Sequence, residues 1–157
     1  MNNTFIEKYF YSLKNTDLSQ MTEHSLRPVL HELLKNIAEN VNKEIKILHE
    51  PKRNRYGFGS PDFQILTDAS VIGYLENKKI DEDLQKTLKS EQIKKYQQLS
   101  HNILVTNYLH WIWLKDNEVV ENVELAKITD LRKKNFKPSD EKFKNIVKII
   151  ENFFSQT

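Results

Sequence analysis

The chain of 157 residues has no cysteine, only three glycines and four prolines, and a net charge of just +2. Without cysteine it can form neither disulfide bonds nor a thiolate metal site, which is typical of cytoplasmic proteins. No stretch approaches the ~20 apolar residues of a membrane-spanning helix, and the amino terminus lacks the pattern of a secretory signal. The composition, with 38% hydrophobic and 29% charged residues, predicts one soluble domain with a substantial core.

Several functional motifs are missing as well. The sequence has no Gly-x-x-x-x-Gly-Lys phosphate loop, and its five histidines show no paired metal-ligand spacing. ATP use and a histidine-based metal site are therefore not indicated. The small net charge does not indicate a nucleic-acid partner either, so any DNA-binding surface must be local.

Two short runs rich in β-branched and aromatic residues, 63–66 and 71–75, flank a turn-prone segment. They predict an antiparallel hairpin. Asp62 precedes the first strand, and Glu76 and Lys78 follow the second, so all three charges are expected at one end of the sheet. Glu76 and Lys78 are two residues apart, which places both side chains on one face.

Such a cluster suits a hard divalent cation. Two neighbouring carboxylates repel each other unless a cation lies between them, and oxygen ligands are those that Mg²⁺ prefers. The cation would polarise a phosphodiester and orient a water, while a lysine would stabilise developing charge or help to deprotonate the water. The alternative is a hairpin whose charged ends are simply solvated.

The motifs around the hairpin resemble those of a nuclease superfamily. Pro61-Asp62, a gap of thirteen residues and Glu76-Asn77-Lys78 are similar to the PD-(D/E)XK signature. Residues 22–113 resemble, more specifically, the amino-terminal endonuclease domain of type IIG and related restriction-modification enzymes, which fuse DNA cleavage and methylation in one polypeptide. Four segments carry this resemblance: Thr22-Glu23-His24-Ser25-Leu26-Arg27-Pro28, Glu50-Pro51-Lys52-Arg53, Gly59-Ser60-Pro61-Asp62-Phe63 and Gly73-Tyr74-Leu75-Glu76-Asn77-Lys78.

The resemblance implies an α/β, restriction-endonuclease-like fold, with a mixed central sheet of about four or five strands flanked by helices. It implies Mg²⁺-dependent cleavage of double-stranded DNA, with Mn²⁺ as a substitute for Mg²⁺. Asp62 and Glu76 would bind the metal, with the Asn77 carbonyl as a further ligand, and Lys78 would be catalytic. The alternative is a non-catalytic DNA-binding or assembly module that keeps the nuclease fold.

The fused enzymes also carry methyltransferase and target-recognition domains, whose motifs are absent from this sequence. The chain is then either the nuclease portion of a larger protein or a solitary nuclease. We take residues 1–137 as the nuclease domain and residues 138–157 as a C-terminal helix, a candidate connector to a methyltransferase region. A dimer would allow both DNA strands to be cut.

Nucleases of this kind usually bring a third acidic residue from the first core helix, and Glu23 and Glu32 compete for that role. Glu23 matches the Thr-Glu-x-x-x-Arg pattern and, if helical, lies at the edge of the apolar stripe, whereas Glu32 lies well away from it. We favour Glu23 as a catalytic residue; its alternative role is a charge at a helix amino terminus. Arg27 would then pair with Glu23 or another site carboxylate, or be exposed.

Gln92 and Tyr96 resemble a Gln-x-x-x-Tyr element that flanks the active site in a subset of these nucleases. The two residues share a helix face, and ordinary packing is the alternative. Upstream, Lys52, Arg53 and Arg55 lie in a loop that also holds two of the three glycines. These cations are predicted to contact DNA phosphates, with a solvated loop as the alternative.

Apolar periodicity predicts the remaining elements. We expect helices over residues 4–14, 25–41 with Ser25 as a cap, about 83–99, and 139–154 with Ser139 as a cap. We expect further strands over residues 44–49, 103–106 and 108–114, and an edge strand at 118–120.

Overall fold

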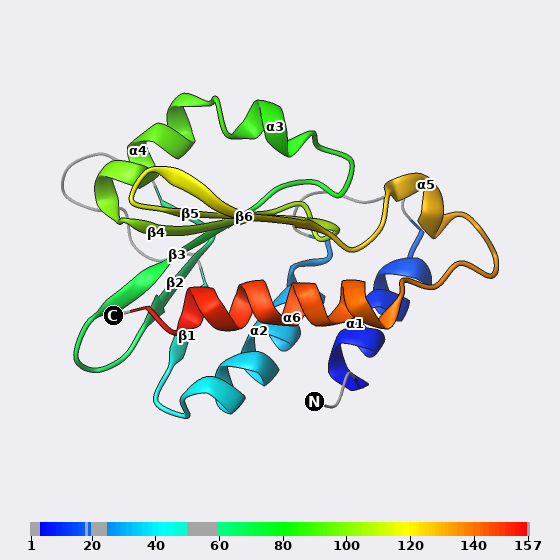
Figure 1. Ribbon diagram of the computed structural model, residues 1–157, viewed down its shortest axis with the longest axis horizontal. Coiled ribbons are helices and arrows are strands. Elements are labelled where there is room, and N and C mark those ends of the chain that lie inside the picture. Colours follow the sequence, from blue (N-terminus) through cyan, green and yellow to red (C-terminus); the bar gives the residue numbers. More distant parts are fainter. Residues whose placement is uncertain (1–3, 18, 20–24, 50–59, 157) are drawn as a thin grey trace.

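The computed structural model describes residues 4–17, 19, 25–49 and 60–156 (Figure 1). Glu23 and the three loop cations Lys52, Arg53 and Arg55 lie outside these residues, so their predicted roles stay predictions.

A six-stranded mixed sheet forms the centre of the domain. Its strands lie in sequence order: β1 (Lys46–His49), β2 (Phe63–Leu66), β3 (Val71–Asn77), β4 (Asn102–Thr106), β5 (His110–Lys115) and β6 (Glu118–Glu124). Neighbouring strands pair antiparallel except β3 and β4, which run parallel. The predicted α/β class is confirmed, with more strands than expected. The tight turn at Asp116 and Asn117, whose φ angles of 51° and 69° suit these residue types, lets β6 pair along the whole of β5.

Helices cover both faces of the sheet (Figure 1). On one face lie α1 (Thr4–Lys14), α2 (Arg27–Val41) and α6 (Asp140–Phe154), and on the other lie α3 (Leu84–Thr87) and α4 (Glu91–Leu99). The short α5 (Ile128–Leu131) lies between β6 and α6.

Two expected helix boundaries are wrong. The single helix predicted over 83–99 is two helices, because Asp83 and Ser90 each cap a separate start: Asp83 accepts from the Gln85 amide and Ser90 from the Ile93 amide. The N-cap residue of α2 is Leu26, one residue after the predicted Ser25. Pro28 occupies the first turn of α2, where a missing amide proton costs nothing.

The carboxy-terminal helix α6 belongs to the main core. Ser139 caps it, as predicted, by accepting from the Lys142 amide at 3.2 Å. Its apolar face is buried, through Phe143, Ile146, Val147, Ile149, Ile150, Phe153 and Phe154. These side chains pack in one cluster with those of α1, α2 and the sheet, so the domain itself covers this face. The domain boundary at 137 and a connector role for this helix stay predictions.

The parallel pair β3–β4, which positions the candidate site, is held by a buried asparagine. The Asn102 amide donates to the main-chain oxygens of Ile72 and Phe153, and its oxygen accepts from the Trp113 indole at 2.7 Å. Opposite it, Gly73 approaches so closely that an added Cβ would lie 2.4 Å from the Asn102 carbonyl oxygen. Glycine at 73 is thus required by close packing between the two strands.

Candidate metal and catalytic site

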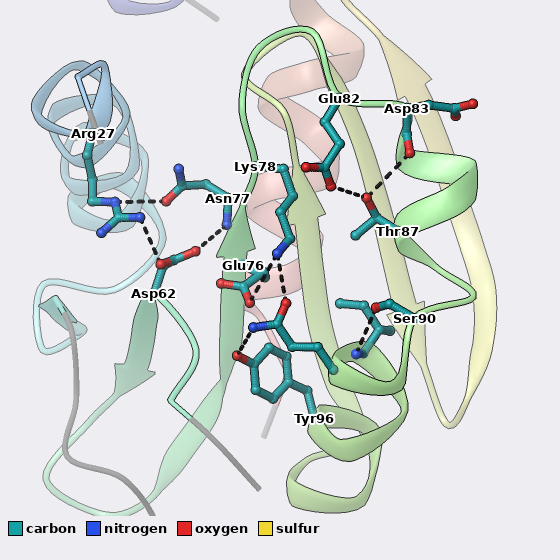
Figure 2. Close-up of polar contacts among 12 residues, drawn as sticks. Arg27, Asp62, Glu76, Asn77, Lys78, Glu82, Asp83, Thr87, Ser90 and Tyr96 are labelled. Atoms are coloured by element: carbon teal, nitrogen blue, oxygen red, sulfur yellow. Dashed lines mark hydrogen bonds and ion pairs between the residues drawn. The ribbon is translucent and has the colours of Figure 1, made fainter. Parts of the chain in front are cut away.

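The β2–β3 hairpin brings the three charges of the signature to one end of the sheet. Phe63 pairs with Leu75, so Asp62 lies beside Glu76. Glu76 and Lys78 point to the same side of β3, with the Lys78 ammonium 4.0 Å from Glu76 Oε2 (Figure 2). The structure therefore places Asp62, Glu76 and Lys78 together, as the motif spacing predicts.

Two donors orient the Asp62 carboxylate. Arg27 Nη2 donates to Oδ1 at 2.8 Å, and the main-chain N–H of Asn77 donates to Oδ2 at 2.8 Å. Arg27 is only 3% exposed, and its Nε also donates to the Asn77 side-chain oxygen at 3.1 Å. Of the alternatives considered for Arg27, the structure shows pairing with a site carboxylate. A carboxylate has about four lone-pair sites, so these two hydrogen bonds leave sites on Asp62 for a cation.

Glu76 carries the most perturbed carboxyl group of the site. It is 3% exposed, and among the described residues its Oε2 has no hydrogen-bond partner. Burial, together with hydrogen bonding to Asp62 and repulsion from its charge, raises the pKa of Glu76 from 4.5 to about 9. Lys78 and a hydrogen bond with Tyr96 oppose this rise. At neutral pH and without a cation, the Glu76 carboxyl therefore holds a proton.

The Gln-x-x-x-Tyr pair on α4 reaches the same site. Lys78 Nζ donates to the Gln92 side-chain oxygen at 2.7 Å, and Gln92 Nε2 donates to the Tyr96 hydroxyl at 2.9 Å. Burial, and then the charge of Glu76, raise the pKa of Tyr96 above its ordinary value, so its hydroxyl stays protonated. This chain of contacts gives the Lys78 ammonium a defined direction.

The structure separates other candidate residues from this cluster. Glu32 is exposed on α2 and pairs with Lys8 of α1 at 3.4 Å, so it faces away from the site. The Asn77 side chain points toward Arg27 (Figure 2), and its amide donates to the Tyr108 hydroxyl at 2.9 Å. Only the Asn77 main chain can therefore serve as a ligand, and that role stays a prediction.

His49, at the end of β1, is a site residue that sequence reasoning missed. Its Nε2 lies 3.1 Å from Arg27 Nη1, and its ring stacks on Phe63 with centroids 5.0 Å apart. The spacing of the histidines along the chain carries no sign of this contact. The contact could have been predicted if the first strand had been paired with the hairpin, because the β1–β2 register sets His49 opposite Phe63, next to Asp62.

The donor set fits a hard divalent cation. Asp62 and Glu76 offer two adjacent carboxylates, and the buried Glu76 Oε2 has the Lys78 ammonium at 4.0 Å but no hydrogen-bond partner among the described residues. Within the part of the chain that the structure describes, no group of three or more Asp, Glu or His side chains could hold a metal. The two carboxylates would thus need main-chain oxygens, waters or an undescribed residue to complete the shell.

In the ranges described, no helix is long and apolar enough to cross a membrane. No family model matches the sequence, and no curated protein matches it. The fold is similar to part of the chain in a cryo-EM structure of a DrdV–DNA complex, with a TM-score of 0.74 and 17% identity. The match covers 99% of this chain and 14% of that chain, and the conclusion it supports is a shared fold.

Proposed function

We propose that this chain is a metal-dependent DNA endonuclease domain that hydrolyses phosphodiester bonds, the cleavage module of a restriction-modification enzyme. The observation that carries the proposal is the meeting of Asp62, Glu76 and Lys78 at the end of one hairpin, with Glu76 buried beside Asp62. The motif resemblance supports the reaction type. The fold shared with a segment of a DNA-bound protein supports DNA as the substrate.

In the proposed site, Asp62 and Glu76 hold Mg²⁺ or Mn²⁺, with the Asn77 carbonyl as a further ligand. A bound cation would supply polarisation of the phosphodiester and a more acidic water. Because the Glu76 carboxyl is protonated at neutral pH without a cation, cation binding releases a proton.

The remaining residues act on charge and orientation. The Lys78 ammonium, directed by Gln92, stabilises the negative charge that develops on the phosphate or assists the attacking water. Arg27 donates to Asp62 and so holds that carboxylate in place. Glu23 would add a third acidic group.

A nicking assay tests this proposal with an isosteric pair of variants. Supercoiled plasmid is incubated with the purified chain and Mn²⁺ or Mg²⁺, with and without chelator. Lys78→Met keeps nearly the length of the side chain but removes its charge, and we expect the nicking rate to fall about 10²-fold or more. Lys46→Met is the control, since Lys46 is exposed and pairs with Asp68 at the far end of the hairpin. The assignment is refuted if Lys78→Met nicks the plasmid as fast as Lys46→Met does, or if Asp62→Ala nicks it as fast as the parent chain.

A second candidate function is DNA binding without cleavage. One observation favours it: the described residues supply only two carboxylates at the site and no three-residue metal cluster. A titration with duplex DNA at two salt concentrations would show binding that weakens steeply with salt. Such binding together with an absence of metal-dependent nicking would favour this candidate over the first.

We also propose that methylation and target recognition lie in other parts of a longer polypeptide, since the chain matches only 14% of the DNA-bound protein with the same fold. Cutting both strands of the duplex would then require a dimer of such a polypeptide.

A further inference from the structure

The guanidinium of Arg27 links the ends of three neighbouring strands. Nη2 donates to Asp62, just before β2, at 2.8 Å, and Nε donates to the side chain of Asn77, at the end of β3, at 3.1 Å. Nη1 lies 3.1 Å from Nε2 of His49, at the end of β1. All three nitrogens of the group thus have a defined neighbour, in a side chain that is 3% exposed.

The contact with His49 has one chemical interpretation. Arginine remains protonated and has only donors, so the His49 Nε2 lone pair accepts the hydrogen bond. The His49 ring is therefore neutral in this contact and carries its proton on Nδ1. Stacking on Phe63, with an interplanar angle of 25°, holds the ring in this direction.

These contacts decide how Arg27 binds Asp62. Nε donates to the Asn77 side chain, Nη1 donates to His49 and Nη2 donates to Asp62 Oδ1, so the guanidinium is fixed from three directions. Asp62 Oδ2 accepts a hydrogen bond from the main-chain N–H of Asn77 at 2.8 Å. Asp62 therefore has one oxygen fixed by Arg27 and the other by the main chain of β3.

We propose that His49 is a positioning residue that orients the Asp62 carboxylate through Arg27. By accepting from Nη1, His49 helps to hold the guanidinium in the direction in which Nη2 reaches Asp62 Oδ1. The consequence for cation binding rests on the proposed function, whereas the consequence for the direction of Asp62 does not.

The chain offers a matched control in His31. This residue, on α2, packs against the edge of the same Phe63 ring, with centroids 5.7 Å apart. In the described ranges no hydrogen bond joins His31 to Arg27. A role in packing around Phe63 would affect both histidines, whereas a role through Arg27 would affect His49 alone.

Three variants of the purified chain separate these roles. His49→Phe keeps a stacking ring but removes the acceptor, His49→Gln keeps an acceptor near the position of Nε2, and His31→Phe alters only the packing. One readout is Mn²⁺ affinity by calorimetry. The other readout, taken without metal, is the NMR resonance of the main-chain amide proton of Asn77, which reports the hydrogen bond of that proton to Asp62 Oδ2.

We expect His49→Phe to weaken Mn²⁺ binding at least about tenfold and to shift the Asn77 amide resonance. We expect His49→Gln and His31→Phe to stay within about threefold of the parent chain, with that resonance unchanged. An unchanged Asn77 resonance in His49→Phe, or an equal change in His31→Phe, would overturn the inference. If the parent chain neither binds Mn²⁺ nor nicks DNA while the Asn77 resonance still moves as expected, the proposed function fails and the positioning role stands.

Discussion

Replacing Glu76 by glutamine should stabilise the cation-free protein and abolish cation binding. The buried carboxyl lies beside the Asp62 charge, and the two groups compete for protons. Glutamine has nearly the same shape and no charge, and its amide can donate to Asp62. The substitution therefore removes the electrostatic penalty that the site carries when no cation is bound.

The magnitude follows from the two pKa values of Glu76, about 9 in the folded protein against an ordinary 4.5. Because the folded pKa is raised, the folded state keeps its proton when the unfolded state has lost it, and stability falls as pH rises from 4.5 toward 9. The fall is about 1.4 kcal/mol for each pH unit, hence about 3 kcal/mol at pH 7 and under about 1 kcal/mol at pH 5. Glu76→Gln should gain these amounts relative to the parent chain.

Urea unfolding in the presence of chelator, at pH 5 and pH 7, measures this difference. The gain should be several-fold larger at pH 7 than at pH 5. Added Mn²⁺ should stabilise the parent chain but leave the variant unchanged. A variant that is no more stable than the parent at pH 7, or a difference that does not depend on pH, would refute the reasoning.

Asp62→Asn is the opposing control. It removes the other carboxylate, but that one is ion-paired with the buried Arg27 at 2.8 Å. Leaving the guanidinium without this partner should destabilise the protein by about 3 kcal/mol, even though one of two mutually repelling charges is gone. Opposite signs for the two substitutions would show that the carboxylates have different structural roles.

Two further predictions concern the surroundings of the site. Gly73→Ala should destabilise the domain by about 3 kcal/mol in urea unfolding, because its Cβ would lie 2.4 Å from the Asn102 carbonyl oxygen; a wild-type midpoint would show that the β3–β4 contact can relax. Tyr96→Phe removes a hydrogen bond that lowers the pKa of Glu76, so Mn²⁺ binding should weaken about tenfold at pH 7 and about fivefold at pH 9, where the parent Glu76 is itself about half ionised. Calorimetric titrations at both pH values measure this effect, and an equal deficit at both would contradict it.

Local patterns in the sequence determined much of this protein. The hairpin follows from two β-branched runs around a turn, and it alone brings Asp62, Glu76 and Lys78 to one sheet end. The helix over 4–14 and the Ser139-capped helix follow from apolar periodicity and from a local cap. Such features are encoded within a few residues of one another, so no knowledge of distant packing is needed.

Tertiary structure alone decided which distant groups meet these charges. Arg27 reaches Asp62, 35 residues away, because α2 packs against the sheet, and His49 joins them because β1 pairs with β2. Glu32, on the same helix as Arg27, turns instead toward Lys8. The Thr-Glu-x-x-x-Arg pattern left the partner of Arg27 open, and no pattern in the sequence indicates the contact with His49. These contacts depend on how the helix is rotated and how the strands are registered, and burial of the whole core determines both.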